Sequence, residues 1–206
     1  MFDDFSDDEG LSSEQEDAFY EALTLVSDPE SKNDLNALGA AHYILYRGFR
    51  NGHVPIYGVD FNQASDALQN SAKCDFLPAL IELAEIHLAA HPSTAIPPTD
   101  EYLGLRGRAL GEKLGIKSDL IKGIDLAQKV ILSSEDHDEK QAIKKSLEDL
   151  YAYVTNPDQT PINAGVMKNQ FNQNEDTCSY DLIVQQRLMD VLRQELQVSN
   201  PRMGLE

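Results

Sequence analysis

Residues 60–88, DFNQASDALQNSAKCDFLPALIELAEIHL, carry small and apolar side chains at the spacing of two packed helices. Asp60 is a favoured helix-capping residue. A stripe of small and apolar residues follows it three and four positions apart: Ala64, Ala67, Leu68, Ser71 and Ala72. Asp75, Phe76 and Pro78 predict a turn and a new helix start. The second helix repeats the pattern with Ala79, Leu83 and Ile86 and, just beside them, Leu80 and His87. The segment therefore predicts an antiparallel helical hairpin with close backbone approach at its alanines.

The rest of the chain shows the same helical spacing, and no segment alternates strictly enough to require a strand. A capping box at residues 13–16 opens one helix, and Pro29 suits the first position of a second that reaches Gly48. Later helices are expected at residues 100–115, 118–132, 134–154 and 179–198. We predict an all-α fold of helical hairpins, arranged like a solenoid or as an irregular bundle.

The predicted domain organisation has four parts. Residues 1–11 are expected to be a disordered acidic tail, and residues 12–154 a helical, repeat-like domain. Residues 155–178 form a predicted polar loop. Residues 179–198 form a C-terminal helix expected to pack on the same domain.

The hairpin resembles the Sel-one-like repeat, a unit related to the tetratricopeptide repeat. Residues 58–60, Gly-Val-Asp, stand for its glycine, valine and capping aspartate, and Ala64, Ser71, Ala72 and Ala79 for its small positions. The residues before Phe49 are similar to its first half, although the tyrosine is displaced and about ten residues are inserted after them. Asp75 stands where the repeat usually has glycine. The resemblance covers residues 35–90 and implies a helical scaffold that binds other proteins.

Charge is unevenly distributed along the 206 residues. Residues 1–34 hold twelve Asp or Glu and one Lys, which is −11 of the chain's net −18. This head, which includes Asp7, Asp8 and Glu9, repels phosphate and would attract a basic protein, so we expect no nucleic-acid partner. The alternative interpretation is a solvated tail that only keeps the protein soluble.

Neither a membrane segment nor a secretory signal is predicted. The longest apolar runs are broken by charges and fall short of the roughly 20 residues that a bilayer requires. The first ten residues are acidic where a signal peptide would be basic and then apolar. With only Cys74 and Cys178 and no disulfide framework, we expect a cytoplasmic protein that has no membrane partner.

No pattern in the sequence predicts an enzyme, a cofactor or a metal site. His87 and His91 have the spacing of paired metal ligands, but no glutamate motif or third ligand accompanies them. Phosphate-binding, dinucleotide and nucleophile motifs are missing from the sequence. We therefore expect a protein without catalytic activity.

Besides the acidic head with Asp7, Asp8 and Glu9, two helical surfaces are candidates for partner binding. One contains Tyr43, Tyr46 and Arg47. The other is the face of the predicted helix 100–115 on which Gly104, Gly107, Gly111 and Gly115 recur three or four residues apart. Each glycine costs roughly 1 kcal/mol in helix propensity, so something must compensate. A closely packed neighbouring helix, a groove for a partner's chain, or a break in the helix would each explain the pattern.

The sequence predicts a non-enzymatic adaptor that binds another protein on a helical surface, and the acidic head favours a basic partner. The alternative is an acidic immunity or inhibitor protein that neutralises a basic toxin or effector. The oligomeric state cannot be predicted.

Overall fold

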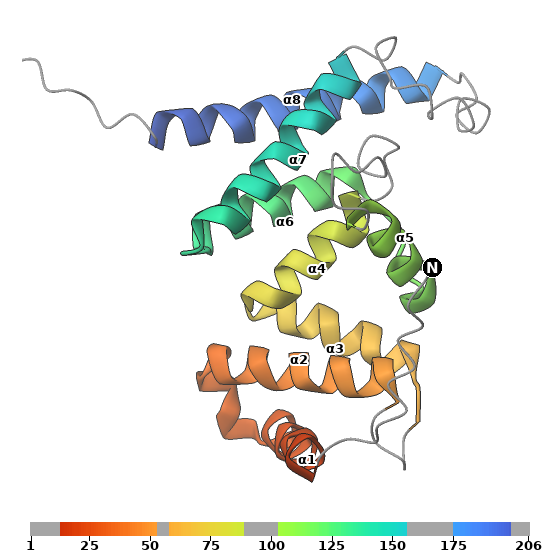
Figure 1. The fold of residues 1–206 in the computed structure, drawn as a ribbon, viewed down its shortest axis with the longest axis vertical. Coiled ribbons are helices and arrows are strands. Elements are labelled where there is room, and N and C mark those ends of the chain that lie inside the picture. The colour runs from red at the N-terminus through yellow and green to blue at the C-terminus, as the bar shows by residue number, and fades with distance from the viewer. Residues whose placement is uncertain (1–12, 53–57, 89–102, 156–174, 199–206) are drawn as a thin grey trace, which may run out of the picture. The chain divides into compact units, whose positions relative to one another are not determined.

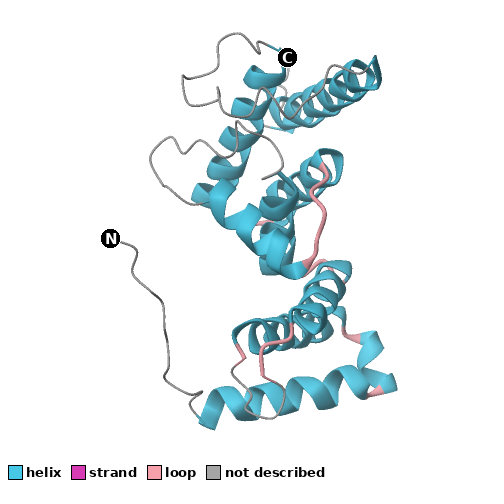
Figure 2. Ribbon diagram, turned by 90° about the vertical axis from the view of Figure 1, so that its right-hand side faces the viewer, coloured by secondary structure: helices cyan, strands magenta, loops and turns pink. Residues whose placement is uncertain are grey.

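The computed structural model describes residues 13–52, 58–88, 103–155 and 175–198, and every regular element in these ranges is a helix (Figure 2). The all-α prediction is therefore confirmed for the described residues. The described residues form two compact units: those up to residue 79 together with 113–115 form one, and those within 80–112 and from 116 onward form the other. None of the described helices is both long and apolar enough to cross a membrane.

The first unit contains α1 (Ser13–Ser27), the 3₁₀ helix η1 (Pro29–Asn33), α2 (Leu35–Asn51) and α3 (Phe61–Lys73), and α2 packs against both α1 and α3 (Figure 1). Aspartates fix three of the helix starts: the Asp28, Asp34 and Asp60 carboxylates each accept a hydrogen bond from a backbone N–H two or three residues later.

The prediction of one helix beginning at Pro29 is wrong. Pro29 opens only the short η1, and α2 begins at Leu35 after its own cap, Asp34, whose Oδ1 lies 3.0 Å from the Ala37 N. The capping residue Asp34 thus starts the helix six residues later than Pro29 alone suggests.

Glycine permits the contact between α1 and α2. A Cβ atom built on Gly48 would overlap the ring of Phe19, which is 1% exposed. The same ring packs edge-on against Phe49, with 5.2 Å between the ring centroids. Any larger residue at position 48 would have to push a fully packed aromatic ring aside.

A second glycine on α2 permits the contact with α3 and with the turn after it. The Ser71 Oγ, fully buried, donates a 2.7 Å hydrogen bond to the Gly39 carbonyl. A Cβ on Gly39 would lie 2.9 Å from the Phe76 Cβ and 3.1 Å from the Cys74 Cβ. Between these two residues Asp75 adopts φ +55°, a left-handed conformation that Asp tolerates, at the position where the Sel-one-like repeat usually has glycine.

The side chains predicted to be buried in residues 60–88 are buried. All five members of the α3 stripe are 8% exposed or less. In α4 (Leu77–Leu88), Ala79, Leu83 and Ile86 are at most 2% exposed, and so are their neighbours Leu80 and His87. The boundary between the two units falls inside α4, after Ala79, so the predicted hairpin is not a unit of its own.

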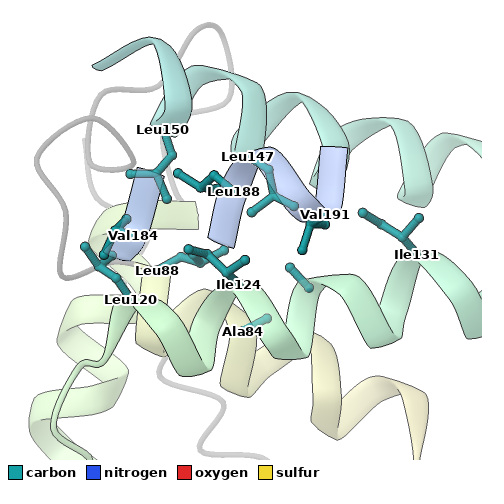
Figure 3. Packing of buried hydrophobic residues seen from close by; sticks show 11 residues of the cluster. Ala84, Leu88, Leu120, Ile124, Ile131, Leu147, Leu150, Val184, Leu188 and Val191 are labelled. Atoms are coloured by element: carbon teal, nitrogen blue, oxygen red, sulfur yellow. The ribbon is translucent and has the colours of Figure 1, made fainter. Parts of the chain in front are cut away.

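The second unit contains the remainder of α4, most of α5 (Leu103–Leu114), and α6 (Leu120–Ser133), α7 (His137–Thr155) and α8 (Glu175–Val198). The last three helices pack against one another. Leu147 and Leu150 of α7 and Val184, Leu188 and Val191 of α8 converge with Ile124 of α6 in a cluster that excludes water (Figure 3). Ala84 and Leu88 of α4 belong to the same cluster.

Three predicted boundaries in this unit are shifted. Ser118 does not begin α6, because Asp119 caps it with 3.0 and 3.2 Å hydrogen bonds from the N–H groups of Ile121 and Lys122. Ser134 ends α6, and the Asp136 carboxylate caps α7. Residues 175–178, predicted as loop, form the first turn of α8; the rest of the predicted loop, 156–174, lies outside the described residues, as does the predicted tail 1–11.

The Gly48 contact gives a direct test of packing in the first unit. Gly48→Ala should lower the free energy of unfolding by up to about 2 kcal/mol, because overpacking costs roughly 1–3 kcal/mol and the gain in helix propensity returns about 1. Urea denaturation of the purified chain measures the change.

The control is the same substitution in a Phe19→Leu background, where the ring that the new Cβ would strike is gone. There Gly48→Ala should be neutral or stabilising. An equal cost in both backgrounds would show that Phe19 is not what limits position 48.

Candidate functional site

One side of α2 faces solvent although the rest of the helix is packed. We define the α2 outer face by four residues that recur on this side: Ala40, Tyr43, Ile44 and Arg47. Arg47 is exposed, Ile44 is 38% exposed, and Ala40 and Tyr43 are half-buried. The face thus combines an aromatic ring, a branched aliphatic side chain and a guanidinium.

The Tyr43 ring is held in place by two other rings. Its centroid lies 5.5 Å from that of Tyr46 and 5.5 Å from that of Phe76, in both cases at a tilt near 50°. A ring supported in this way loses little side-chain freedom when a partner covers it, which lowers the entropic cost of binding. The support comes from Phe76, in the turn that also meets Gly39.

Tyr46, predicted as a partner-binding residue, is completely buried. Its hydroxyl accepts a 2.8 Å hydrogen bond from the Arg50 Nη1, and the Arg50 guanidinium lies 5.6 Å from the centre of its ring. Because α2 has helices on two sides, its buried arc is wide enough to include Tyr46. Tyr46 therefore supports the α2 outer face from inside and does not line it.

The glycine-rich helix is α5, and the described part of its glycine face is packed. Gly107 and Gly111 are buried, and a Cβ on Gly111 would lie 3.0 Å from the Ile86 Cγ2 of α4. Gly115 is not on this face, since it ends the helix with φ +64°. Gly104 lies in the first turn of α5. At Gly111, close packing against a neighbouring helix occupies the space that a partner's chain would need.

The acidic residues Asp7, Asp8 and Glu9 and the histidine His91 lie outside the described residues. Within the described ranges, no group of three or more His, Cys, Asp or Glu side chains could hold a metal ion. Burial raises the pKa of the Cys74 thiol, and the neighbouring Asp75 raises it further, which is the opposite of what activates a nucleophile.

A polar contact joins α8 to α6 that the sequence did not predict. The Arg187 Nε lies 2.6 Å from the Asp125 Oδ1, and its Nη2 donates a 3.0 Å hydrogen bond to the Gln128 Oε1. Both charged side chains are partly exposed, at 36% and 49%. No local pattern links residues about sixty positions apart, so only the three-dimensional arrangement reveals the contact.

No protein-family model matches the chain, and neither does any curated protein or solved structure. The similarity to Sel-one-like repeats therefore remains a prediction from residues 35–90.

The contact between Arg187 and Asp125 should make a modest, salt-dependent contribution to stability. Since both side chains are partly exposed, a double-mutant cycle of Arg187→Gln and Asp125→Asn should give a coupling free energy of about 0.2–1 kcal/mol. Urea denaturation at low and at 1 M salt measures the coupling, which should shrink as salt screens the charges.

Arg193→Gln, at an exposed position of the same helix, is the matched control and should change stability by less than about 0.5 kcal/mol. A coupling that does not respond to salt would contradict the electrostatic explanation.

Proposed function

We propose that this chain is a non-enzymatic adaptor that binds another protein through the α2 outer face. The observation that carries the proposal is the exposure of Ile44 and Arg47 beside the half-buried, ring-supported Tyr43. Tyrosine and arginine are enriched among residues that dominate binding energy, and an aliphatic neighbour adds apolar area. The proposed partner covers the α2 outer face with a surface that forms hydrogen bonds or an ion pair with Arg47 and packs on the Tyr43 ring.

The rigidity of the surroundings supports the proposal. The two glycine contacts fix α2 against its neighbours, and the Tyr43 ring packs on the buried Tyr46 ring, whose hydroxyl accepts a hydrogen bond from Arg50. Binding residues on a fixed helix keep their geometry before the partner arrives, so less ordering is required on association.

The test is affinity capture from the native cell, with quantitative mass spectrometry, of wild type and of the double variant Arg47→Glu, Ile44→Gln. If the α2 outer face is the binding surface, the variant should lose the partner, with an affinity reduction of about 30-fold or more, equivalent to roughly 2 kcal/mol at a hot spot. Melting temperatures should stay close to wild type, because both side chains are exposed.

The second unit offers a matched control. Lys145→Glu with Leu132→Gln makes the same charge change and also removes one exposed aliphatic side chain, since Lys145 is exposed and Leu132 is 63% exposed. This control should retain the partner. If wild type and the α2 variant captured the partner equally well, the α2 outer face would not be the binding surface.

A second candidate function, neutralisation of a basic protein, is favoured by the acidity of α1. Glu14, Asp17 and Glu21 are exposed and recur three and four residues apart, so they form a stripe along one side of the helix. We define these three as the α1 acidic stripe. Attraction between this negatively charged stripe and a positively charged partner would accelerate their association at low salt.

The two candidates are separated by a charge-neutral variant of the stripe, Glu14→Gln, Asp17→Asn, Glu21→Gln. For a basic partner, the association rate of the captured protein should fall several-fold at low salt, and the difference should shrink at physiological ionic strength, where charges are screened beyond about 8 Å. Glu112→Gln, Glu135→Gln, Glu148→Gln removes three exposed acids elsewhere and serves as the control. Identical rates for stripe variant and wild type at low salt would remove the support for neutralisation.

A further inference from the structure

The end of α4 is enclosed by close contacts within the second unit. A Cβ on Gly111 of α5 would lie 3.0 Å from the Ile86 Cγ2, and one on Gly123 of α6 would lie 3.0 Å from the Leu88 backbone N. The Ser118 Oγ also donates a 3.3 Å hydrogen bond to the Ile86 carbonyl. The backbones of α5 and α6 therefore lie close to Ile86 and Leu88, the two sequence neighbours of His87.

The His87 side chain is buried at 2% exposure. Among the residues that the structure describes, neither its Nδ1 nor its Nε2 has a hydrogen-bond partner. A neutral imidazole has one donor and one acceptor, whereas the protonated ring has two donors and a positive charge. Both forms lose hydration in this position, and the charged form loses far more.

The charged groups around the ring do not compensate for this loss. Burial is the main cause that lowers the pKa of His87 to about 4, and Lys122 of α6 lowers it further. Asp119, the α6 cap, and the Lys117 backbone favour the protonated ring, but their effects are smaller. The Asp119 Oδ1 already accepts hydrogen bonds from two backbone N–H groups of α6. These N–H groups stabilise its negative charge, so the carboxylate is not dedicated to the His87 ring.

We propose that His87 is an acid-sensitive latch, whose protonation opens the packing of the end of α4 against Gly111, Ser118 and Gly123. At neutral pH the uncharged ring fills the space between these contacts. In acid the ring takes a proton from solvent and requires water around it, which the closed arrangement does not supply. The end of α4 and the start of α6 then separate until the ring is hydrated.

The direction of the pH effect follows from proton binding. In the open state the ring has its ordinary pKa of 6.5, whereas in the closed state its pKa is about 4. The opening equilibrium is therefore least favourable above about pH 6.5, and it shifts toward the open state as the pH falls toward 4. Between pH 7 and pH 5 the opening equilibrium should shift by about 20-fold.

Hydrogen exchange of the full chain, corrected for the intrinsic effect of pH, tests the latch. From pH 7 to pH 5, protection in residues 80–88 and 116–124 should fall about 20-fold more than in residues 13–51 of the first unit. His87→Leu should abolish this extra loss, and His87→Met should do the same if the leucine variant packs poorly. His137→Gln, at an exposed histidine of α7, should retain it.

Nuclear magnetic resonance of the wild-type histidine rings gives a readout that needs no variant. In the folded chain, the His87 ring should remain neutral well below pH 6. A His87 ring that titrates near 6.5 with the fold intact, or an equal loss of protection in wild type and both His87 variants, would overturn the proposal.

Discussion

The first unit depends on α2 fitting between two neighbours at van der Waals distance. Gly48 accepts the Phe19 ring on one side, and Gly39 accepts Ser71, Cys74 and Phe76 on the other. Each glycine weakens the helix by roughly 1 kcal/mol, so the packing that it permits has to contribute more than that. The buried rings and the fully buried Ser71 hydrogen bond are the contributions that do so.

Glycines also allow close helix contacts in the second unit, where they lie close to the sequence neighbours of the buried His87. The mutual packing of α6, α7 and α8 rests on branched aliphatic side chains, and glycine appears where α5 and α6 meet the end of α4. Within the described residues, the His87 ring is buried and its two nitrogens have no hydrogen-bond partner. The proposed latch depends on the ring staying neutral, because burial costs the charged ring far more free energy than the neutral one.

The sequence was sufficient to predict what local patterns encode. Helical spacing and capping residues such as Asp60 predicted the class of fold, the α3 stripe and the buried side of α4, because burial and capping act over a few residues. The burial of Tyr46 and the wide packed arc of α2 could not be predicted, since a periodic stripe implies one neighbour and α2 has two. The choice between neighbouring caps, such as Ser134 and Asp136, also depends on tertiary packing.

The same packing decides which surfaces remain for a partner. Neighbouring side chains occupy the space beside Gly39 and Gly48 of α2 and beside Gly111 of α5, so these three glycines mark internal contacts. Two exposed surfaces of the first unit differ chemically: the mixed aromatic, aliphatic and cationic α2 outer face, and the purely anionic α1 acidic stripe. Contacts to the first would be governed by apolar area and by fit, which salt hardly alters, whereas contacts to the second are screened within about 8 Å. Salt dependence is therefore the physical property that distinguishes an adaptor that uses α2 from a neutralising protein that uses α1.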